Sequence, residues 1–362
     1  MFFEGRFIRP FLISLVSALP VVGNAQTNPL LKVSFETFNY SEVTSLSAIS
    51  GKWNDRVSNG NKALSVSRFI AGYEGNNYSL QTINRSDSYY RFNHETAWFI
   101  RLIENQIPLD TGRDYVLDIK PNRSSSKGFR VGSYYQFSEA FKLSGYFSLL
   151  NATNLLQGNL LGQASSISPT DYNFNFNSDL VYENDPLYGR STNQVRGNGY
   201  AIDLIIDYSL SDNWHLNVQL LDLAGELSFD SVNHTQASAT SAIKNFDENG
   251  YLQYDPVISG IEDNQGFLYK FDMQTQIAVT YHFSERKNIV LEYHQLFDFN
   301  YPKLILENQF EWGLLSWRLI PQLEAVGMGY QQSNFSVSIE TDRIDFEGMK
   351  YLSIDLHYLW FL

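Results

Sequence analysis

The chain ends in the stretch Tyr351-Leu352-Ser353-Ile354-Asp355-Leu356-His357-Tyr358-Leu359-Trp360-Phe361-Leu362. Its even-numbered residues are all apolar or aromatic, whereas Ser353, Asp355 and His357 fall between them. Because successive side chains of a β-strand point to opposite sides, this alternation predicts a strand with one apolar face and one partly polar face. A soluble protein that exposed such a long apolar edge strand would be prone to aggregation.

This aromatic-rich end resembles the C-terminal assembly signal of Gram-negative outer-membrane β-barrel proteins, with Phe361 one position before the end. The resemblance implies an all-β fold, a transmembrane antiparallel up-and-down barrel in the cell outer membrane. It also implies contact with outer-membrane lipid and lipopolysaccharide, and recognition of the last strand by the barrel-assembly machinery. The residues that would form the signal are Leu352, Ile354, Leu356, Tyr358, Trp360, Phe361 and Leu362.

The first 25 residues have the features of a cleaved signal peptide. Arg6 and Arg9 precede an apolar segment, residues 11–22, that is too short to span a bilayer. Gly23-Asn24-Ala25 then supplies the small residues that a signal peptidase requires. We therefore expect export, with residues 26–362 forming one barrel domain. The chain has no Cys, and a barrel held by a closed hydrogen-bond ladder needs no disulfide.

Composition agrees with a barrel and excludes some functions. The formal net charge of −13 argues against a nucleic-acid partner, which requires a basic surface. The 23 Tyr and 26 Phe suit aromatic girdles at both membrane interfaces. After the leader, no apolar run approaches the roughly 20 residues that a transmembrane helix needs.

Several runs alternate clearly enough to predict strands. In residues 271–283 the odd positions from Phe271 to Phe283 are mostly apolar, so we expect them to face lipid. Short polar segments between strands predict tight periplasmic turns at 75–77, 138–140, 211–213 and 284–288. Two long segments, 151–198 and 230–269, are expected to be extracellular loops.

The pattern predicts about fourteen strands, within a range of about 12 to 16. The predicted strands begin near residues 31, 62, 77, 95, 113, 128, 141, 198, 213, 269, 288, 313, 334 and 350. Residues 95–105 fit a helical period equally well, and such a helix would plug the lumen. Residues 172–182 alternate like a strand, but strand direction leaves no place for them in the barrel, so we expect pairing within their own loop.

Catalytic and metal motifs are sparse. His282 and Ser284 resemble the catalytic pairs of outer-membrane phospholipase and lipid A deacylase, but their expected inward and periplasmic positions argue against catalysis. Asp355 with His357, and Glu292 with His294, are i, i+2 pairs that suit a metal site less well than a polar lumen. We therefore expect no catalytic, cofactor or metal site.

The inward faces of the predicted strands carry carboxylates and histidines. An open lumen with such carboxylates would favour cations, unless Arg130, Lys142 and Arg318 pair with them. The leading hypothesis is therefore a channel for diffusion or export of a polar or cationic solute. The alternatives are a plugged barrel that serves as surface anchor, assembly factor or adhesin, and a lipid-modifying barrel enzyme. The residues predicted to line the lumen are Asp203, Asp207, Asp272, His282, Glu292, His294, Glu340, Asp355 and His357.

Overall fold

The computed structural model describes residues 30–51, 57–75, 77–184, 196–241, 245–246, 252–253 and 257–361. The expected signal peptide, residues 1–25, and the terminal Leu362 lie outside the described residues.

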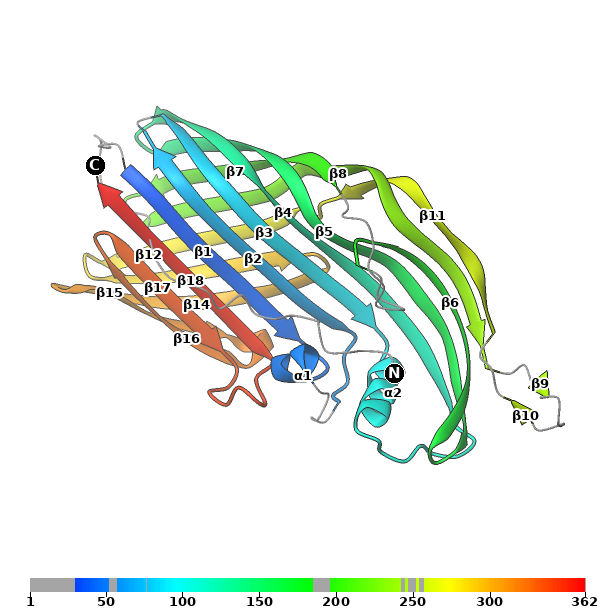
Figure 1. Cartoon of the computed structure of the whole chain (residues 1–362). Coiled ribbons are helices and arrows are strands. Elements are labelled where there is room, and N and C mark those ends of the chain that lie inside the picture. Colours follow the sequence, from blue (N-terminus) through cyan, green and yellow to red (C-terminus); the bar gives the residue numbers. More distant parts are fainter. Residues whose placement is uncertain are drawn as a thin grey trace.

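Fourteen antiparallel strands close into one barrel (Figure 1). The first and last strands pair along their whole lengths, from Leu30 opposite Phe361 to Tyr40 opposite Tyr351. We call the end of the barrel where these two strands start and finish the inner end, and the opposite end the outer end. The barrel strands are β1 (Leu30–Ser41), β2 (Lys62–Glu74), β3 (Tyr78–Phe92), β4 (Asp114–Ser138), β5 (Phe141–Ser168), β7 (Gly197–Ser211), β8 (Trp214–Thr240), β12 (Gln274–Ser284), β13 (Lys287–Leu296), β14 (Phe299–Phe310), β15 (Gly313–Ile320), β16 (Ala325–Gln332), β17 (Phe335–Thr341) and β18 (Tyr351–Phe361).

Alternate side chains on the barrel wall are apolar and point outward. Phe129 on β4 is 67% exposed and Leu291 on β13 is 57% exposed, as is typical of a lipid-facing surface. Aromatic rings gather around the inner end, where Trp214 packs on Tyr281 and Phe310 stacks on Trp312. The protein is thus built as an outer-membrane β-barrel, with one aromatic girdle at its inner end.

Beyond the barrel, four strands continue as a projecting sheet that we call the extension. It consists of the outer parts of β5 and β8 together with β6 (Asp171–Tyr182) and β11 (Val257–Lys270), as Figure 1 shows. β5 pairs with β7 near the inner end and with β6 further out. β8 pairs with β12 up to Leu221 and with β11 from Glu226 onward.

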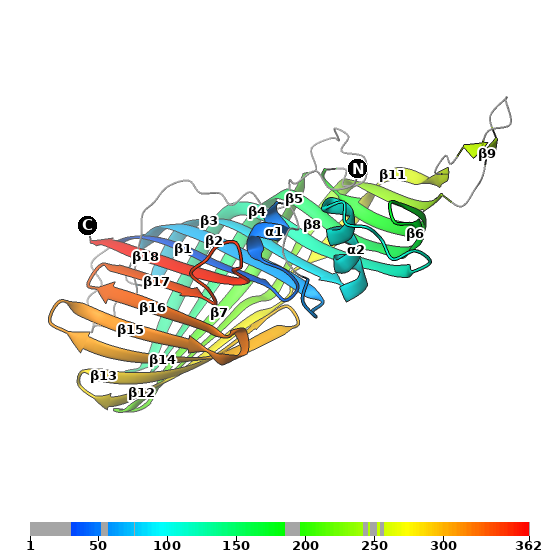
Figure 2. The ribbon, with the colours of Figure 1, turned by 90° about the horizontal axis from the view of Figure 1, so that it is seen from below.

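The extension corrects the expectation of long loops at 151–198 and 230–269. The described parts of these segments are mostly strand, because alternating polar and apolar residues pair with each other outside the membrane. Residues 172–182 form β6, which pairs with β5 inside its own segment, as predicted, and also with β8 of the other long segment, which was not predicted. A small hairpin of β9 (Asn245–Phe246) and β10 (Leu252–Gln253) lies at the far tip (Figure 2).

The predicted strand near residue 95 is wrong, and the helical alternative is correct. α2 (His94–Glu104) begins at Asn93, whose side chain accepts a hydrogen bond from the Thr96 N–H at 2.7 Å. Its apolar face packs on Tyr115 and Ala164, beyond the end of β3, so the helix lies at the outer rim and does not enter the lumen (Figure 1). α1 (Leu46–Ser50) and the 3₁₀ turn η1 (Pro321–Leu323) also cap outer ends of strands. In the described residues, the helices are too short and too polar to cross a membrane.

The predicted strand number is right, but several predicted positions are wrong. The starts near 113 and 128 belong to a single strand, β4, which is 25 residues long and changes its inward face at a bulge between Ser125 and Ser126. β14 and β16 were missed. Pro302 interrupts the first, and Gly327 and Gly329 weaken the strand pattern of the second. The four predicted turns do join neighbouring barrel strands at the inner end.

Gly158 on β5 should be essential for the extension. Its φ is +143°, and a Cβ there would lie 2.0 Å from the carbonyl oxygen of Asp179 on β6. We expect Gly158→Ala to cost about 1–3 kcal/mol locally and to increase amide hydrogen exchange in β6. Gly145→Ala on the same strand is the control, because its Cβ would meet nothing within 4 Å. Equal exchange in both variants would contradict this account.

His234 on β8 should make the extension sensitive to pH. Its Nδ1 lies 2.9 Å from Asp263 on β11, and its Nε2 lies 3.0 Å from Asp179 on β6. Burial lowers the pKa of His234, but the two carboxylates outweigh burial and raise it above the ordinary 6.5. The stabilisation is therefore complete below about pH 6.5 and is lost as pH rises through the raised pKa.

In the wild type, we expect amide hydrogen exchange in β6 and β11, corrected for the intrinsic exchange rate, to increase as the pH rises through the raised pKa of His234. His234→Gln removes the titrating group and should show little such change. A variant with the same pH dependence as the wild type would contradict the assignment.

Candidate functional site

A first network of charges crosses the lumen between β3 and β8, which are separated in the wall by β4, β5 and β7. Arg85 donates to both carboxylate oxygens of Asp222, at 2.5 and 2.9 Å, and also binds Asp87. Arg68 on β2 reaches the same carboxylate at 3.1 Å. The side chains of Arg85 and Asp222 are 3% and 0% exposed, so side chains fill the lumen at this level.

Asp222 occupies an unusual backbone position. Its φ of 56° is in the left-handed region, which Asp tolerates better than most residues. It lies where the pairing of β7 and β8 shifts register, and where β8 exchanges β12 for β11 as its partner. Its N–H donates to Asp203 at 2.8 Å, and Asp203 binds Arg130 at 2.8 Å. We call Arg68, Arg85, Asp87, Arg130, Asp203 and Asp222 the β3–β8 network.

A second network lies on the opposite wall, on β13 to β18. Glu340 is fully buried and binds Lys303 at 2.7 Å and Arg318 at 2.9 Å. The Tyr351 hydroxyl donates to the same carboxylate at 2.5 Å. Glu292 and Asp355 extend the cluster, 3.6 Å from Lys303 and 3.5 Å from Arg318 respectively. We call Glu292, Lys303, Arg318, Glu340 and Asp355 the β14–β17 network.

Aromatic rings bridge the lumen near its outer mouth. Phe38 on β1 stacks on Tyr301 of β14 at 5.2 Å, although four strands separate β1 and β14 in the wall. Tyr89 on β3 stacks at 4.9 Å on Phe297, which lies in the two-residue turn between β13 and β14. Phe297 has a φ of 55°, a strained value for a bulky residue, so contacts across the mouth must hold this turn in place.

Asp298, the other residue of this turn, ties it to the opposite rim. Its carboxylate accepts a hydrogen bond from the Tyr89 hydroxyl and lies 3.4 Å from Lys62 and 4.0 Å from Arg91. Burial raises the pKa of Asp298, but the Tyr89 hydrogen bond and the Lys62 ammonium outweigh it and hold the pKa below the ordinary 3.8. We call Phe297 and Asp298 the rim turn.

The residues predicted to line the lumen do not form one site. Glu292, His294, Glu340 and Asp355 come together in or beside the β14–β17 network, where His294 lies 2.8 Å from Glu292. Asp203 joins the β3–β8 network instead. The others are dispersed, with Asp207 bound to Asn217, His282 to Asn288, Asp272 to Asn122, and His357 3.9 Å from Glu36.

The pairing cations predicted from sequence behave differently from one another. Arg130 and Arg318 bind carboxylates of the two networks, whereas Lys142 lies over the ring of Tyr134 at 4.7 Å. Phe271, predicted to face lipid, instead packs inside against Arg85 at 4.2 Å, because residues 271–273 leave the strand pattern between β11 and β12. Ser284 accepts from the Arg286 N–H, away from His282.

Sequence reasoning missed Arg68, Arg85, Asp87, Asp222 and Lys303. Arg85 and Asp87 have the same i, i+2 spacing that singled out Glu292 and His294, so that signal was available. Asp222 gave a weaker signal, because the adjacent Leu220 and Leu221 break the alternation of β8 and indicate a bulge. Lys303 was hidden because Pro302 obscured its strand.

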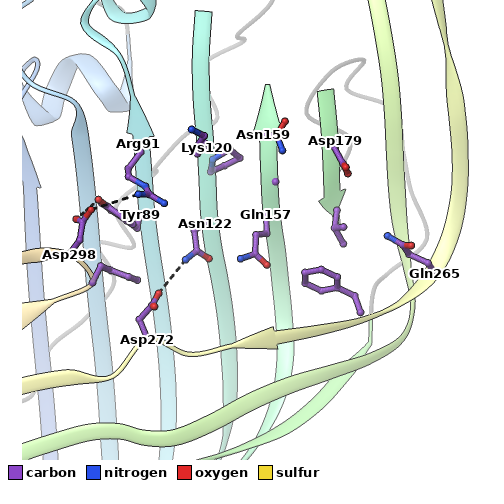
Figure 3. A pocket seen from close by; sticks show the side chains of 15 residues that line it. Tyr89, Arg91, Lys120, Asn122, Gln157, Asn159, Asp179, Gln265, Asp272 and Asp298 are labelled. Carbon is purple, nitrogen blue, oxygen red and sulfur yellow. Dashed lines mark hydrogen bonds and ion pairs between the residues drawn. The ribbon is translucent and has the colours of Figure 1, made fainter. Parts of the chain in front are cut away.

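A cavity of about 700 Å³ lies at the outer mouth and is bordered on one side by the rim turn (Figure 3). β3, β4, β5, β6 and β11 contribute to it, and Figure 3 shows Asn122, Gln157 and Asn159 on neighbouring strands with Gln265 on the far side. Asp272 borders it and accepts from Asn122 at 3.4 Å. Burial raises the pKa of Asp272, and Arg91 and Asn122 only partly oppose this effect.

Among the residues that the structure describes, no group of three or more His, Cys, Asp or Glu side chains is arranged to hold a metal ion. His234 lies within hydrogen-bond distance of two carboxylates and His294 of one, whereas His215 and His357 lie 3.8 and 3.9 Å from a carboxylate. The arrangement therefore supports polar binding and charge pairing across a lumen.

No family model matches the sequence, and no curated protein matches it significantly. Among solved structures, the toluene transporter TodX of Pseudomonas putida is similar at 11% identity and a TM-score of 0.44, covering 93% of this chain and 91% of that chain. The CymD monoaromatic hydrocarbon channel is similar at 10% identity and a TM-score of 0.44, covering 93% and 89%. A Pseudomonas aeruginosa FadL homologue gives 7% identity and a TM-score of 0.33, covering 92% and 88%. Such distant likeness assigns no solute to this chain.

Proposed function

We propose that this protein is a gated outer-membrane channel for a small polar solute, closed in the conformation described above. The observation that carries the proposal is that buried charged side chains from non-adjacent strands meet inside the lumen in two networks. Buried ion pairs contribute little net stability compared with well-packed apolar side chains. If the lumen had only to be packed for stability, apolar side chains such as Leu and Phe would stabilise the barrel equally well.

Unpartnered polar atoms inside the barrel support the same proposal. In the described residues, the hydroxyls of Ser79, Ser126 and Ser148 and the Nε atoms of Arg130 and Arg318 are buried without a hydrogen-bond partner. Buried polar groups are normally satisfied by protein or by ordered water. A lumen with so many unused polar atoms suits the passage of a hydrated solute.

The two networks contain nearly equal numbers of cations and carboxylates. The β3–β8 network balances Arg68, Arg85 and Arg130 against three aspartates. In the β14–β17 network, Lys303 and Arg318 face three carboxylates, with His294 beside them. All but one of the six carboxylates in the two networks are thus matched in number by an ammonium or guanidinium group, so they form no open ring of carboxylates, and the proposed solute is polar without a required charge.

The extension supports a second candidate, a surface anchor or adhesin. Its four strands project beyond the rim (Figure 2), and residues 258–264 of β11 are exposed. An anchor needs no opening of the lumen, so single-channel recordings in planar bilayers separate the two functions. Discrete current steps would support the channel function. If neither the wild type nor any variant described below gives such steps, the channel function is wrong and the anchor function is favoured.

Asp222→Asn should open the channel. The amide keeps the left-handed backbone accessible but removes the charge that holds Arg68 and Arg85. Breaking a buried pair costs about 3–5 kcal/mol, and about 1.4 kcal/mol corresponds to a factor of ten, so open probability should rise at least about tenfold. Asp207→Asn is the matched control, because Asp207 is partly exposed and bonds locally to Asn217.

Heat-modifiable migration in gels will show whether both variants remain folded. If folded Asp222→Asn has the same open probability as the wild type, the β3–β8 network does not close the channel.

Asp298→Ala should have a smaller effect of the same sign. It releases the rim turn from Tyr89, Lys62 and Arg91, but the Asp298 side chain is 49% exposed and its ion pairs are correspondingly weak. We expect more frequent brief openings in the same bilayer recordings. Asp345→Ala, in the exposed loop between β17 and β18, is the control. Identical records for the two variants would show that the rim turn does not gate.

A further inference from the structure

We propose that the cavity at the outer mouth is a binding site for a neutral, polyhydroxylated ligand of the size of a mono- to trisaccharide. The proposal rests on the channel function, since such a site would select the solute before entry. The volume of about 700 Å³ falls within the roughly 300–1,000 Å³ typical of ligand sites.

Four carboxamides supply the polar recognition. Asn122 on β4, Gln157 and Asn159 on β5, and Gln265 on β11 line the cavity from different strands (Figure 3). Within the described part of the chain, the side chains of Gln157, Asn159 and Gln265 form no hydrogen bond, so their donors and acceptors are available. Each amide both donates and accepts, which matches a hydroxyl group, itself a donor and an acceptor.

The backbone is shaped to present two of these amides together. Gly158 lies between Gln157 and Asn159, and its φ of +143° lets the β6 backbone pass where a Cβ would collide with Asp179. The two flanking side chains therefore point into the same space on one face of β5. A side chain at position 158 would push β6 away and change the cavity wall.

Aromatic faces supply the apolar part of recognition. Tyr89, Phe267 and Phe297 border the cavity. The C–H faces of sugar rings pack on such aromatic surfaces, while their hydroxyls point sideways to polar groups. An aromatic platform beside a set of amides therefore suits a molecule that has both kinds of surface.

The charged lining residues are already engaged, so they do not call for a charged ligand. Lys120 lies 3.2 Å from Asp118, and Arg91 lies near Asp298. Asp179 binds His234 at 3.0 Å and Asp272 binds Asn122. A cationic or anionic solute would compete with these pairs, whereas a neutral ligand leaves them intact.

The test is calorimetric titration of the purified full-length barrel in detergent with glucose, maltose, sucrose, lactose and cellotriose, each at millimolar concentration. We expect at least one sugar to bind. Its affinity should fall at least about tenfold in the double variant Gln157→Leu/Gln265→Leu, in which apolar side chains of similar volume replace two amides. Gln163→Leu, on the same strand but outside the cavity, should bind like the wild type. Arginine, spermidine and p-xylene serve as cationic and apolar probes.

Failure of this proposal differs from failure of the channel function. Channel currents without sugar binding, sugar binding unaffected by the double variant, or tighter binding of a charged or apolar probe would each overturn the sugar site. If the wild type binds sugar, the double variant does not, and no current is ever recorded, the sugar site stands and the channel function is wrong. Heat-modifiable migration of the double variant shows that its barrel is folded.

Discussion

The hydrogen-bond ladder between β1 and β18 is the constraint on which the rest of the structure depends. A β-sheet in a bilayer cannot leave an edge, because unpaired N–H and C=O groups in hydrocarbon are costly. Pairing from Leu30 with Phe361 to Tyr40 with Tyr351 removes both edges at once. Closure fixes which residues point inward, and therefore brings charges from distant parts of the sequence into one lumen.

That enclosed lumen explains why so many charged residues are buried. A lone buried charge would be prohibitively costly, but each carboxylate of the two networks lies beside a cation, on the same strand for Asp87 and on another strand for the others. The pairing holds the walls at a defined separation and uses side chains only, which reorient far more easily than backbone. The rim turn adds a strained element at the mouth, where Phe297 keeps an unfavourable φ through its contact with Tyr89.

The sequence predicted the class of fold well and the site poorly, for physical reasons. Alternation with period two is a local property, so it identified β18, β5 and β7 and the correct strand number. It failed where local chemistry interrupts the pattern, at Pro302 in β14 and at the bulge in β4. It also carried no information about which inward residues meet, because Arg85 and Asp222 are brought together only by closure of the barrel. The extension was mistaken for loops because most of its residues in 151–168 and 230–240 are polar and show no continuous alternation.

The continuity of β8 has a mechanical consequence. The strand is 27 residues long and runs without a break from the inner end of the barrel into the extension. Asp222 marks the point where its partner changes, and His234, about 40 Å further along at roughly 3.3 Å per residue, binds the neighbouring strands of the extension. Strand pairing holds β8 before and after Asp222 and Leu223 but not at these two residues, where its partners change, so a displacement of the extension would bend the strand at this point. A force on the extension, from a bound solute or a contacting surface, would therefore be transmitted along β8 to Asp222, the residue that crosses the lumen. The proposed binding region and the proposed gate would then be joined by one continuous strand.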